Sequence, residues 1–323
     1  MKESTKTSKS AFAKDVDKGL SSDPKYLSSK YFYDDEGSRL FQEIMKLPEY
    51  YLTRAEMEVF TEQGDQIYKA FGADGEDFDL IELGAGDGTK TAVLVDYFLK
   101  KNADFSFVPI DISSEAIDSI TRFFNERFPR LQVEPEVGDY FATLETFRET
   151  SDRRKIILFL GSNIGNFSEE QAVSFFSHLR EVVSPDDRIL IGFDLHKNPR
   201  TILNAYDDSL GVTPKFNLNL LKRINRELGG NFNVDKFVHY AGYHPLERAA
   251  RSFLISEVEQ TVKVESLGKE FHFRQWEPIF MEISQKYDLP MIEKLANDSG
   301  FEVVENFFDS NRFYADSMWK PAG

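Results

Sequence analysis

Apolar and polar residues follow one another in two different rhythms along the chain. From residue 78 to about residue 195, short apolar runs are followed by stretches with apolar positions at helical spacing. The runs predict strands that begin at Phe78, Phe105, Leu131, Lys155 and Arg188, separated by helices at 89–101, at 114–128 and from Ser168. Strands that alternate with helices in this way indicate an α/β fold, with a mostly parallel sheet covered by helices on both faces.

The segments on either side of this region lack the alternation. Residues 10–20 predict a helix, and residues 28–60 predict short helices interrupted at Gly37 and Pro48. After His196 we expect helices at 198–208 and 217–230 and antiparallel strands at 236–243, 251–266 and 269–284. We interpret this part as an insertion, after which residues 300–321 form a hairpin that returns to the edge of the sheet.

A glycine-rich turn follows the first predicted strand of the alternating region. In "IELGAGDGTK", Gly84, Gly86 and Gly88 stand between an apolar strand and a helix, where absent side chains let backbone N–H groups approach a ligand. The dinucleotide-binding fingerprint needs its third glycine three residues after the second, and here the spacing is two. The turn therefore argues against NAD and FAD, and it can also be read as an ordinary tight turn.

Acidic residues stand at the ends of three successive predicted strands, at Glu82, Asp111 and Asp139. Together with the glycine turn, they resemble the pattern of the class I S-adenosylmethionine-dependent methyltransferases. The resemblance implies a Rossmann-like sheet that binds S-adenosylmethionine, in which a carboxylate at Asp111 accepts hydrogen bonds from the ribose and Asp139 accepts one from the adenine amine. Singly, each acidic residue is better explained as an ordinary loop residue, and only the set favours a cofactor site.

The strand that begins at Lys155 ends in "FLGSNIGNF", which has more small and amide residues than a turn requires. Ser168 is a suitable N-cap for the next helix, with Glu169 and Glu170 behind it. Asn166 is therefore not needed as a cap. Because its amide can donate to a carboxylate and accept from an amine, we expect Asn166 to hold a small polar substrate beside the cofactor.

Five longer segments follow one another along nearly the whole chain: "YFYDDEGSRLFQEIMKLPEYYLTRAE", residues 81–91, "FLGSNIGNF", "LNAYDDSLGVTPKFNLNLLKRINRELGGNF" and "MEISQKY". Together they resemble one particular family, the histidine-specific N-alpha-methyltransferases of ergothioneine biosynthesis. The resemblance implies an enzyme that adds three methyl groups to the α-amino nitrogen of L-histidine and so forms hercynine.

The resemblance also assigns roles to individual residues. The substrate's carboxylate and amine would be held by the catalytic residues Tyr50, Asn166 and Tyr206, and its imidazole by Glu282 and Ser284 with Tyr33 nearby. The cofactor-binding residues would be Glu82, Gly84, Gly86, Lys90, Asp111, Asp139 and Tyr140. Residues 60–196 and 287–323 would form the cofactor-binding domain, and residues 9–59 and 197–286 an α+β substrate-binding domain.

Composition narrows the possible partners and location. The net charge of −16, from 39 basic and 55 acidic residues, opposes binding to nucleic acid. The chain has no cysteine, no apolar leader and no apolar stretch long enough to span a membrane, so we expect a cytoplasmic enzyme that binds no membrane. Its five histidines lack the spacing of metal ligands, so no metal is expected. We expect a monomer.

Two further functions remain open from the sequence. A related enzyme could methylate another amino acid, for example one with an indole ring, but a buried carboxylate at Glu282 would gain little from a large apolar ring. A protein of another class could sense S-adenosylmethionine without catalysis, although Tyr50, Asn166 and Tyr206 would then have no role. A nucleic-acid methyltransferase is disfavoured by the charge.

Overall fold

The computed structural model of this protein describes residues 2–72, 76–138, 140–150 and 153–323. The chain forms two compact units, a first unit of residues 1–51 and 197–284 and a second unit of residues 52–196 and 285–323. The predicted assignment of substrate binding and cofactor binding to separate domains stays a prediction. In the described part of the chain, no helix has the length and apolar character needed to cross a lipid bilayer.

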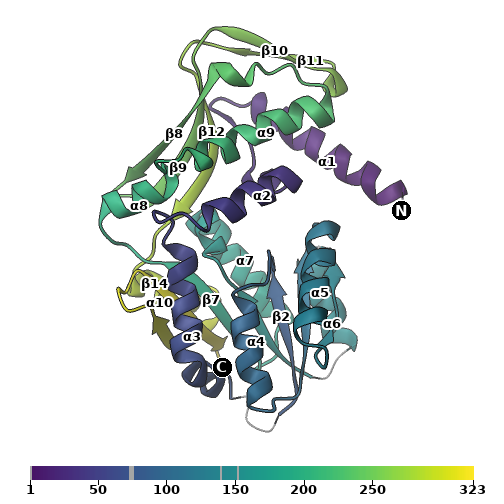
Figure 1. Ribbon diagram of the computed structural model, residues 1–323, viewed down its shortest axis with the longest axis vertical. Helices are drawn as coiled ribbons and strands as arrows, with labels where there is room; N and C mark the ends of the chain where they lie inside the picture. The colour runs from purple at the N-terminus through teal and green to yellow at the C-terminus, as the bar shows by residue number, and fades with distance from the viewer. Residues whose placement is uncertain (1, 73–75, 139, 151–152) are drawn as a thin grey trace. The chain divides into compact units, whose positions relative to one another are not determined.

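The second unit is built on a sheet whose strands run in the order β13-β14-β7-β6-β2-β3-β4, with β5 also paired to β3 (Figure 1). Its strands are β2 (Phe78–Leu83), β3 (Phe105–Asp111), β4 (Gln132–Val133), β5 (Glu136–Val137), β6 (Arg154–Phe159), β7 (Arg188–Asp194), β13 (Phe301–Phe308) and β14 (Tyr314–Pro321). Its helices are α3 (Leu52–Phe71), α4 (Thr91–Lys100), α5 (Ser114–Arg127), α6 (Tyr140–Thr150), η2 (Asn163–Asn166), α7 (Glu169–Val182) and α10 (Leu289–Asp298). The pairs β2–β3, β2–β6 and β6–β7 are parallel, so the predicted mostly parallel α/β sheet is confirmed.

Helices cover both faces of this sheet because its central strands are apolar on both sides. Leu80 and Phe107 pack with α3, α4 and α5 on one face, whereas Ile81 and Val108 pack with α6, α7 and α10 on the other. Figure 1 shows α3 and α4 side by side. All residues of β2 are buried, as expected for a parallel strand between two helical layers.

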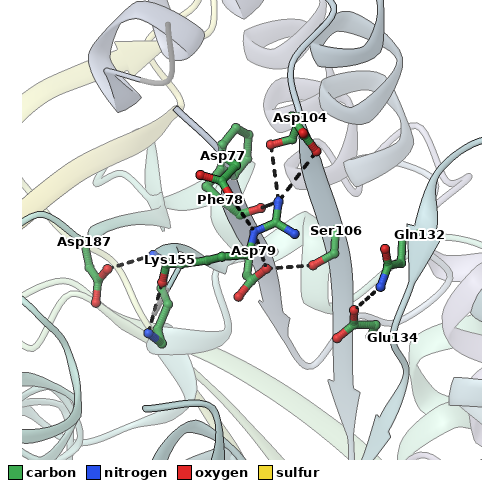
Figure 2. A network of polar contacts seen from close by, with 10 residues as sticks. Asp77, Phe78, Asp79, Asp104, Ser106, Gln132, Glu134, Lys155 and Asp187 are labelled. Carbon is green, nitrogen blue, oxygen red and sulfur yellow. Dashed lines mark hydrogen bonds and ion pairs between the residues drawn. The ribbon is translucent and has the colours of Figure 1, made fainter. Parts of the chain in front are cut away.

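Polar contacts join the amino ends of the central strands, the edge opposite the glycine turn. Asp79 of β2 accepts a hydrogen bond from Ser106 of β3 (2.8 Å) and lies 3.3 Å from the Arg153 guanidinium. Beside them, the Asp187 carboxylate accepts the backbone N–H of Lys155 at 2.7 Å (Figure 2). These contacts hold the register of neighbouring strands.

The first unit carries a sheet of order β1-β12-β9-β8 and a separate β10–β11 ribbon. Its strands are β1 (Lys25–Tyr26), β8 (Phe237–His244), β9 (Ala249–Ser256), β10 (Gln260–Val264), β11 (Lys269–Phe273) and β12 (Pro278–Gln285). Its helices are α1 (Lys2–Leu20), η1 (Ser29–Tyr31), α2 (Asp35–Ile44), α8 (Pro199–Tyr206), α9 (Val212–Leu228), η3 (Val234–Lys236) and η4 (Glu265–Leu267). Helix α9 packs against β8 and β9, and it also contacts α2.

Some predicted elements differ from the structure. Residues 251–266 and 269–284 were each predicted as one extended stretch, yet each divides between β9 or β12 and the separate β10–β11 ribbon. The second break occurs where Trp276 takes a left-handed backbone conformation (φ 66°) and the Glu277 carboxylate accepts the N–H of Arg274 at 2.8 Å. The predicted hairpin at the C-terminal end is confirmed, because β13 pairs with β14 and β14 pairs antiparallel with β7.

Candidate active site

The glycine turn, residues 84–88, connects β2 to α4 at the carboxyl end of the sheet. Its three glycines all have left-handed φ angles, 73° at Gly84, 56° at Gly86 and 68° at Gly88. A Cβ added at Gly88 would lie 2.6 Å from Phe124, so this glycine is required by core packing. A Cβ at Gly86 would have no heavy atom within 4 Å. Gly86 therefore exposes its backbone to open space, as a ligand-binding turn requires.

Two of the predicted carboxylates lie next to this turn. Glu82 is buried, and its Oε1 accepts a hydrogen bond from the Thr91 hydroxyl at 2.7 Å. Its Oε2 has no hydrogen-bond partner among the described residues, and burial raises the pKa of Glu82 to about 8. Asp111 ends β3, the strand beside β2, and burial raises its pKa although the Ser113 N–H donates to it at 2.9 Å. Asp139 lies outside the described residues.

Tyr140 and Lys90 also lie around the turn. Tyr140 is the first residue of α6, and its hydroxyl is 2.8 Å from where a Cβ on Gly84 would stand. Lys90 precedes α4 and forms an ion pair with Glu56. Burial lowers the pKa of Lys90, but the Glu56 carboxylate more than offsets this effect, so that the pKa is raised overall.

The loop of residues 161–166, which we call the amide loop, follows β6, the neighbour of β2 on the other side. It includes η2, at whose end Asn166 lies half-buried. The prediction for Ser168 is confirmed: its hydroxyl accepts the N–H of Gln171, and the Gln171 side chain accepts the N–H of Ser168. Within the described part of the second unit, no hydrogen bond uses the Asn166 amide, which leaves it available to a ligand.

In the first unit, two of the predicted tyrosines belong to one aromatic cluster. The ring of Phe41 lies 5.4 Å from that of Tyr33 and 6.1 Å from that of Tyr50, and Phe216 of α9 lies 5.6 Å from Tyr33. Tyr50 is almost fully buried, whereas Tyr33 is 43% exposed. The cluster therefore fixes Tyr50 and leaves part of Tyr33 accessible.

The remaining predicted substrate residues of the first unit lie on α8 and β12. The Tyr206 hydroxyl donates to Ser284 Oγ at 2.6 Å, which brings together two predicted residues that are 78 positions apart in sequence. Glu282 is on the same strand two positions earlier, where side chains point to the same face. Ser209 donates to Glu49 at 2.7 Å, so the segment after Tyr206 is attached to the residue before Tyr50.

The groups around the glycine turn fit S-adenosylmethionine. The open backbone at Gly86, the unpaired buried oxygen of Glu82 and the carboxylate at the end of β3 offer acceptors and space to a ligand that is cationic and carries hydroxyl groups. None of these features is specific for a phosphate group, which agrees with the glycine spacing that argues against NAD and FAD.

Comparison with known proteins agrees with this geometry. The family model described as "Histidine-specific methyltransferase, SAM-dependent" matches residues 12–321. The protein is thus an enzyme of the S-adenosylmethionine-dependent methyltransferase class, with an α/β Rossmann-like fold. Within that class, the chain belongs to the histidine-specific methyltransferase family.

Three relatives show the range of similarity. The histidine N-alpha-methyltransferase of Mycolicibacterium smegmatis is 35% identical over 86% of this chain and 84% of its own length. Ergothioneine biosynthesis protein 1 of Schizosaccharomyces pombe is 28% identical over 87% of this chain, which spans 37% of that protein. The 4-dimethylallyltryptophan N-methyltransferase easF of Claviceps fusiformis is 27% identical over 62% of this chain and 58% of its own length.

Sequence reasoning missed one charged residue at the centre of the second unit, Glu56 of α3. Glu56 is fully buried. It lies four residues after Leu52 and four residues before Phe60, which are also buried. That spacing places Glu56 on the apolar face of the helix, a signal that was readable in the sequence.

Proposed function

We propose that this protein transfers three methyl groups from S-adenosylmethionine to the α-amino nitrogen of L-histidine, giving hercynine. The observation that carries this proposal is the 35% identity to a histidine N-alpha-methyltransferase over 86% of the chain. The local geometry supports it, since Thr91 holds Glu82, Tyr206 holds Ser284 and the aromatic cluster holds Tyr50.

The second unit would bind the cofactor. The glycine turn would lie against it, with Glu82 and Asp111 accepting its donor groups and Lys90 and Tyr140 beside it. When bound, S-adenosylmethionine supplies an activated methyl group, so the protein has to align the acceptor and exclude water. The raised pKa of Glu82 means that this carboxyl is mostly protonated at neutral pH and can ionise next to a cation.

The amine of the substrate must be uncharged at the moment of transfer, because a protonated amine has no lone pair. The proposal assigns the substrate's amine and carboxylate to Asn166, Tyr50 and Tyr206. An amide offers both a donor and an acceptor, the Tyr50 phenol can donate to the carboxylate, and the Tyr206 oxygen, whose proton goes to Ser284, can accept from the amine. The aromatic rings also suit the product, whose quaternary ammonium interacts favourably with ring faces.

Selectivity for histidine would come from β12. A neutral imidazole has one N–H donor and one acceptor nitrogen, and Glu282 with Ser284 can pair with both. The Tyr206 hydroxyl donates to Ser284 Oγ at 2.6 Å and so helps to fix the orientation of that serine. An amino acid without these ring groups would forgo both hydrogen bonds, which is a source of discrimination.

Incubation of the purified protein with S-adenosylmethionine and histidine tests the proposal. Mass spectrometry should show mono-, di- and trimethylhistidine with the methyl groups on the α-nitrogen. Tryptophan, tested in parallel, should give at least roughly a hundredfold lower kcat/KM, the discrimination expected when buried polar groups lose their partners. Turnover of tryptophan in preference to histidine would replace the substrate and keep the methyl transfer.

The predicted cytoplasmic location, monomeric state and lack of nucleic-acid partners remain predictions. The small-molecule substrate follows from the family.

A further inference from the structure

The buried carboxylate of Glu56 receives donors from several parts of the second unit. Its Oε1 accepts the backbone N–H of Gly161 and the hydroxyl of Tyr314, both at 2.8 Å, and its Oε2 accepts from the ammonium of Lys90. These donors come from the first residue of the amide loop, from β14 and from the second residue after the glycine turn. Glu56 itself is part of α3, so one side chain joins segments that are far apart in sequence.

Glu56 and Lys90 form an ion pair whose opposite charges neutralise each other. Asp316 of β14 is fully buried beside it, and burial together with the charge of Glu56 raises the pKa of Asp316 well above its usual range. This shift favours the neutral form of Asp316, and the carboxylate that pairs with the Lys90 ammonium is that of Glu56. Glu56 has a side-chain exposure of 1% and Lys90 of 18%, so the pair is poorly screened by solvent.

Two glycines leave the space that this arrangement needs. A Cβ on Gly192 of β7 would lie 2.2 Å from the Tyr314 hydroxyl and 2.5 Å from Glu56 Oε1. A Cβ on Gly161 would lie 3.3 Å from the Lys90 ammonium. The backbone of the amide loop thus lies directly against the Glu56–Lys90 pair, at the point where the loop leaves β6.

We propose that Glu56 is a positioning residue for methyl transfer, which fixes the amide loop relative to the glycine turn through Gly161 and Lys90. The inference rests on the proposed function, in which Asn166 at the end of the amide loop holds the acceptor and the glycine turn holds the donor. Transfer depends on the alignment of the acceptor nitrogen with the methyl group, and a displacement of about 1 Å can cost roughly a hundredfold in rate. A side chain that sets the distance between the two segments therefore acts on the rate although it touches neither substrate.

The test compares Glu56→Gln with Glu62→Gln, a matched change at an exposed position of the same helix. Glutamine keeps an oxygen that can accept from Gly161 but cannot pair with the Lys90 ammonium. The measured quantity is the first-order rate constant of a single turnover with both ligands saturating, because it does not depend on how much of the protein is folded. We expect Glu56→Gln to lower it by roughly 10- to 100-fold while the affinity for S-adenosylhomocysteine changes less than about threefold, and Glu62→Gln to match the wild type.

A double-mutant cycle with Lys90→Gln distinguishes positioning through the ion pair from a local effect on Gly161. If Glu56 acts through Lys90, the losses in the double variant are smaller than the product of the two single losses. Should Glu56→Gln fail to fold, Tyr314→Phe removes a donor to the same oxygen at constant volume, and we expect a fall of about threefold in the same rate constant.

A single-turnover rate constant within about twofold of the wild type in Glu56→Gln, or in Tyr314→Phe where that variant is used, would overturn the inference and leave the proposed function intact. A wild-type protein that methylates no amine acceptor would instead refute the proposed function, and the inference with it.

Discussion

The glycine turn allows the cofactor site to be tested separately from the fold, by three alanine substitutions at glycines with similar backbone angles. Gly86, Gly88 and Gly268 have φ angles of 56°, 68° and 60°, so alanine should cost each about 1–2 kcal/mol of the free energy of unfolding. At Gly86 and Gly268 the new Cβ would meet no heavy atom within 4 Å. At Gly88 it would come within 2.8 Å of Ile120 and 2.6 Å of Phe124, which adds about 1–3 kcal/mol of overpacking.

The three variants should differ in cofactor affinity in another order than they differ in stability. Gly86→Ala and Gly268→Ala should lower the unfolding free energy equally, yet we expect only Gly86→Ala to weaken S-adenosylmethionine binding, by roughly tenfold or about 1.4 kcal/mol. Gly88→Ala should be the least stable of the three. Urea unfolding and calorimetric titration measure the two quantities. Wild-type cofactor affinity in Gly86→Ala would refute the assignment of the turn.

Three further predictions concern buried polar groups. Lys286 and Asp194 form an ion pair of 2.7 Å in which both side chains are fully buried. Lys286→Met removes the positive charge beside Asp194, so urea unfolding should show a loss of about 3–5 kcal/mol in the free energy of unfolding. A loss below about 1 kcal/mol would mean that the pair contributes little to stability. Burial raises the pKa of Glu82 to about 8, so this carboxyl is mostly protonated at pH 7. The positive charge of the bound cofactor should favour the ionised carboxylate, and binding at pH 7 should then release about 0.9 proton from Glu82. Calorimetry in buffers of different ionisation enthalpy measures this release, which should vanish at pH 9.5 and in Glu82→Gln; equal release by that variant would exclude the carboxyl as its source. Tyr206→Phe removes the hydroxyl that orients Ser284, so the Kd for histidine should rise by about fivefold, and an unchanged Kd would contradict this role.

The parts of the fold that were predictable depend on local patterns. The strand before the glycine turn is marked by its mainly apolar residues, and Ser168 was predicted as an N-cap from the acidic residues that follow it. The start of α5 at Ser114 also follows a local signal, since the Ser113 side chain accepts the N–H of Ala116. These features were found because the residues that determine them are neighbours in sequence.

The parts that were missed depend on contacts between distant residues. The helix α3 was predicted only as far as Phe60, and the partners of its buried Glu56, Lys90 and Tyr314, come 34 and 258 positions later in the sequence. The aromatic cluster around Phe41 and the Tyr206–Ser284 hydrogen bond likewise join segments that no sequence pattern connects. For the candidate site, the residue types came from the sequence, whereas their local positioning came from the structure.

The central claim is that Asn166 holds the amino acid that is methylated. Calorimetric titration of Asn166→Ala with histidine, in the presence of S-adenosylhomocysteine, tests it most directly. The amide would make hydrogen bonds to the charged groups of the substrate, so its removal should weaken histidine binding by roughly 10- to 100-fold. The affinity for S-adenosylhomocysteine, measured alone, should stay within about twofold of the wild type. Histidine affinity equal to that of the wild type would contradict the account.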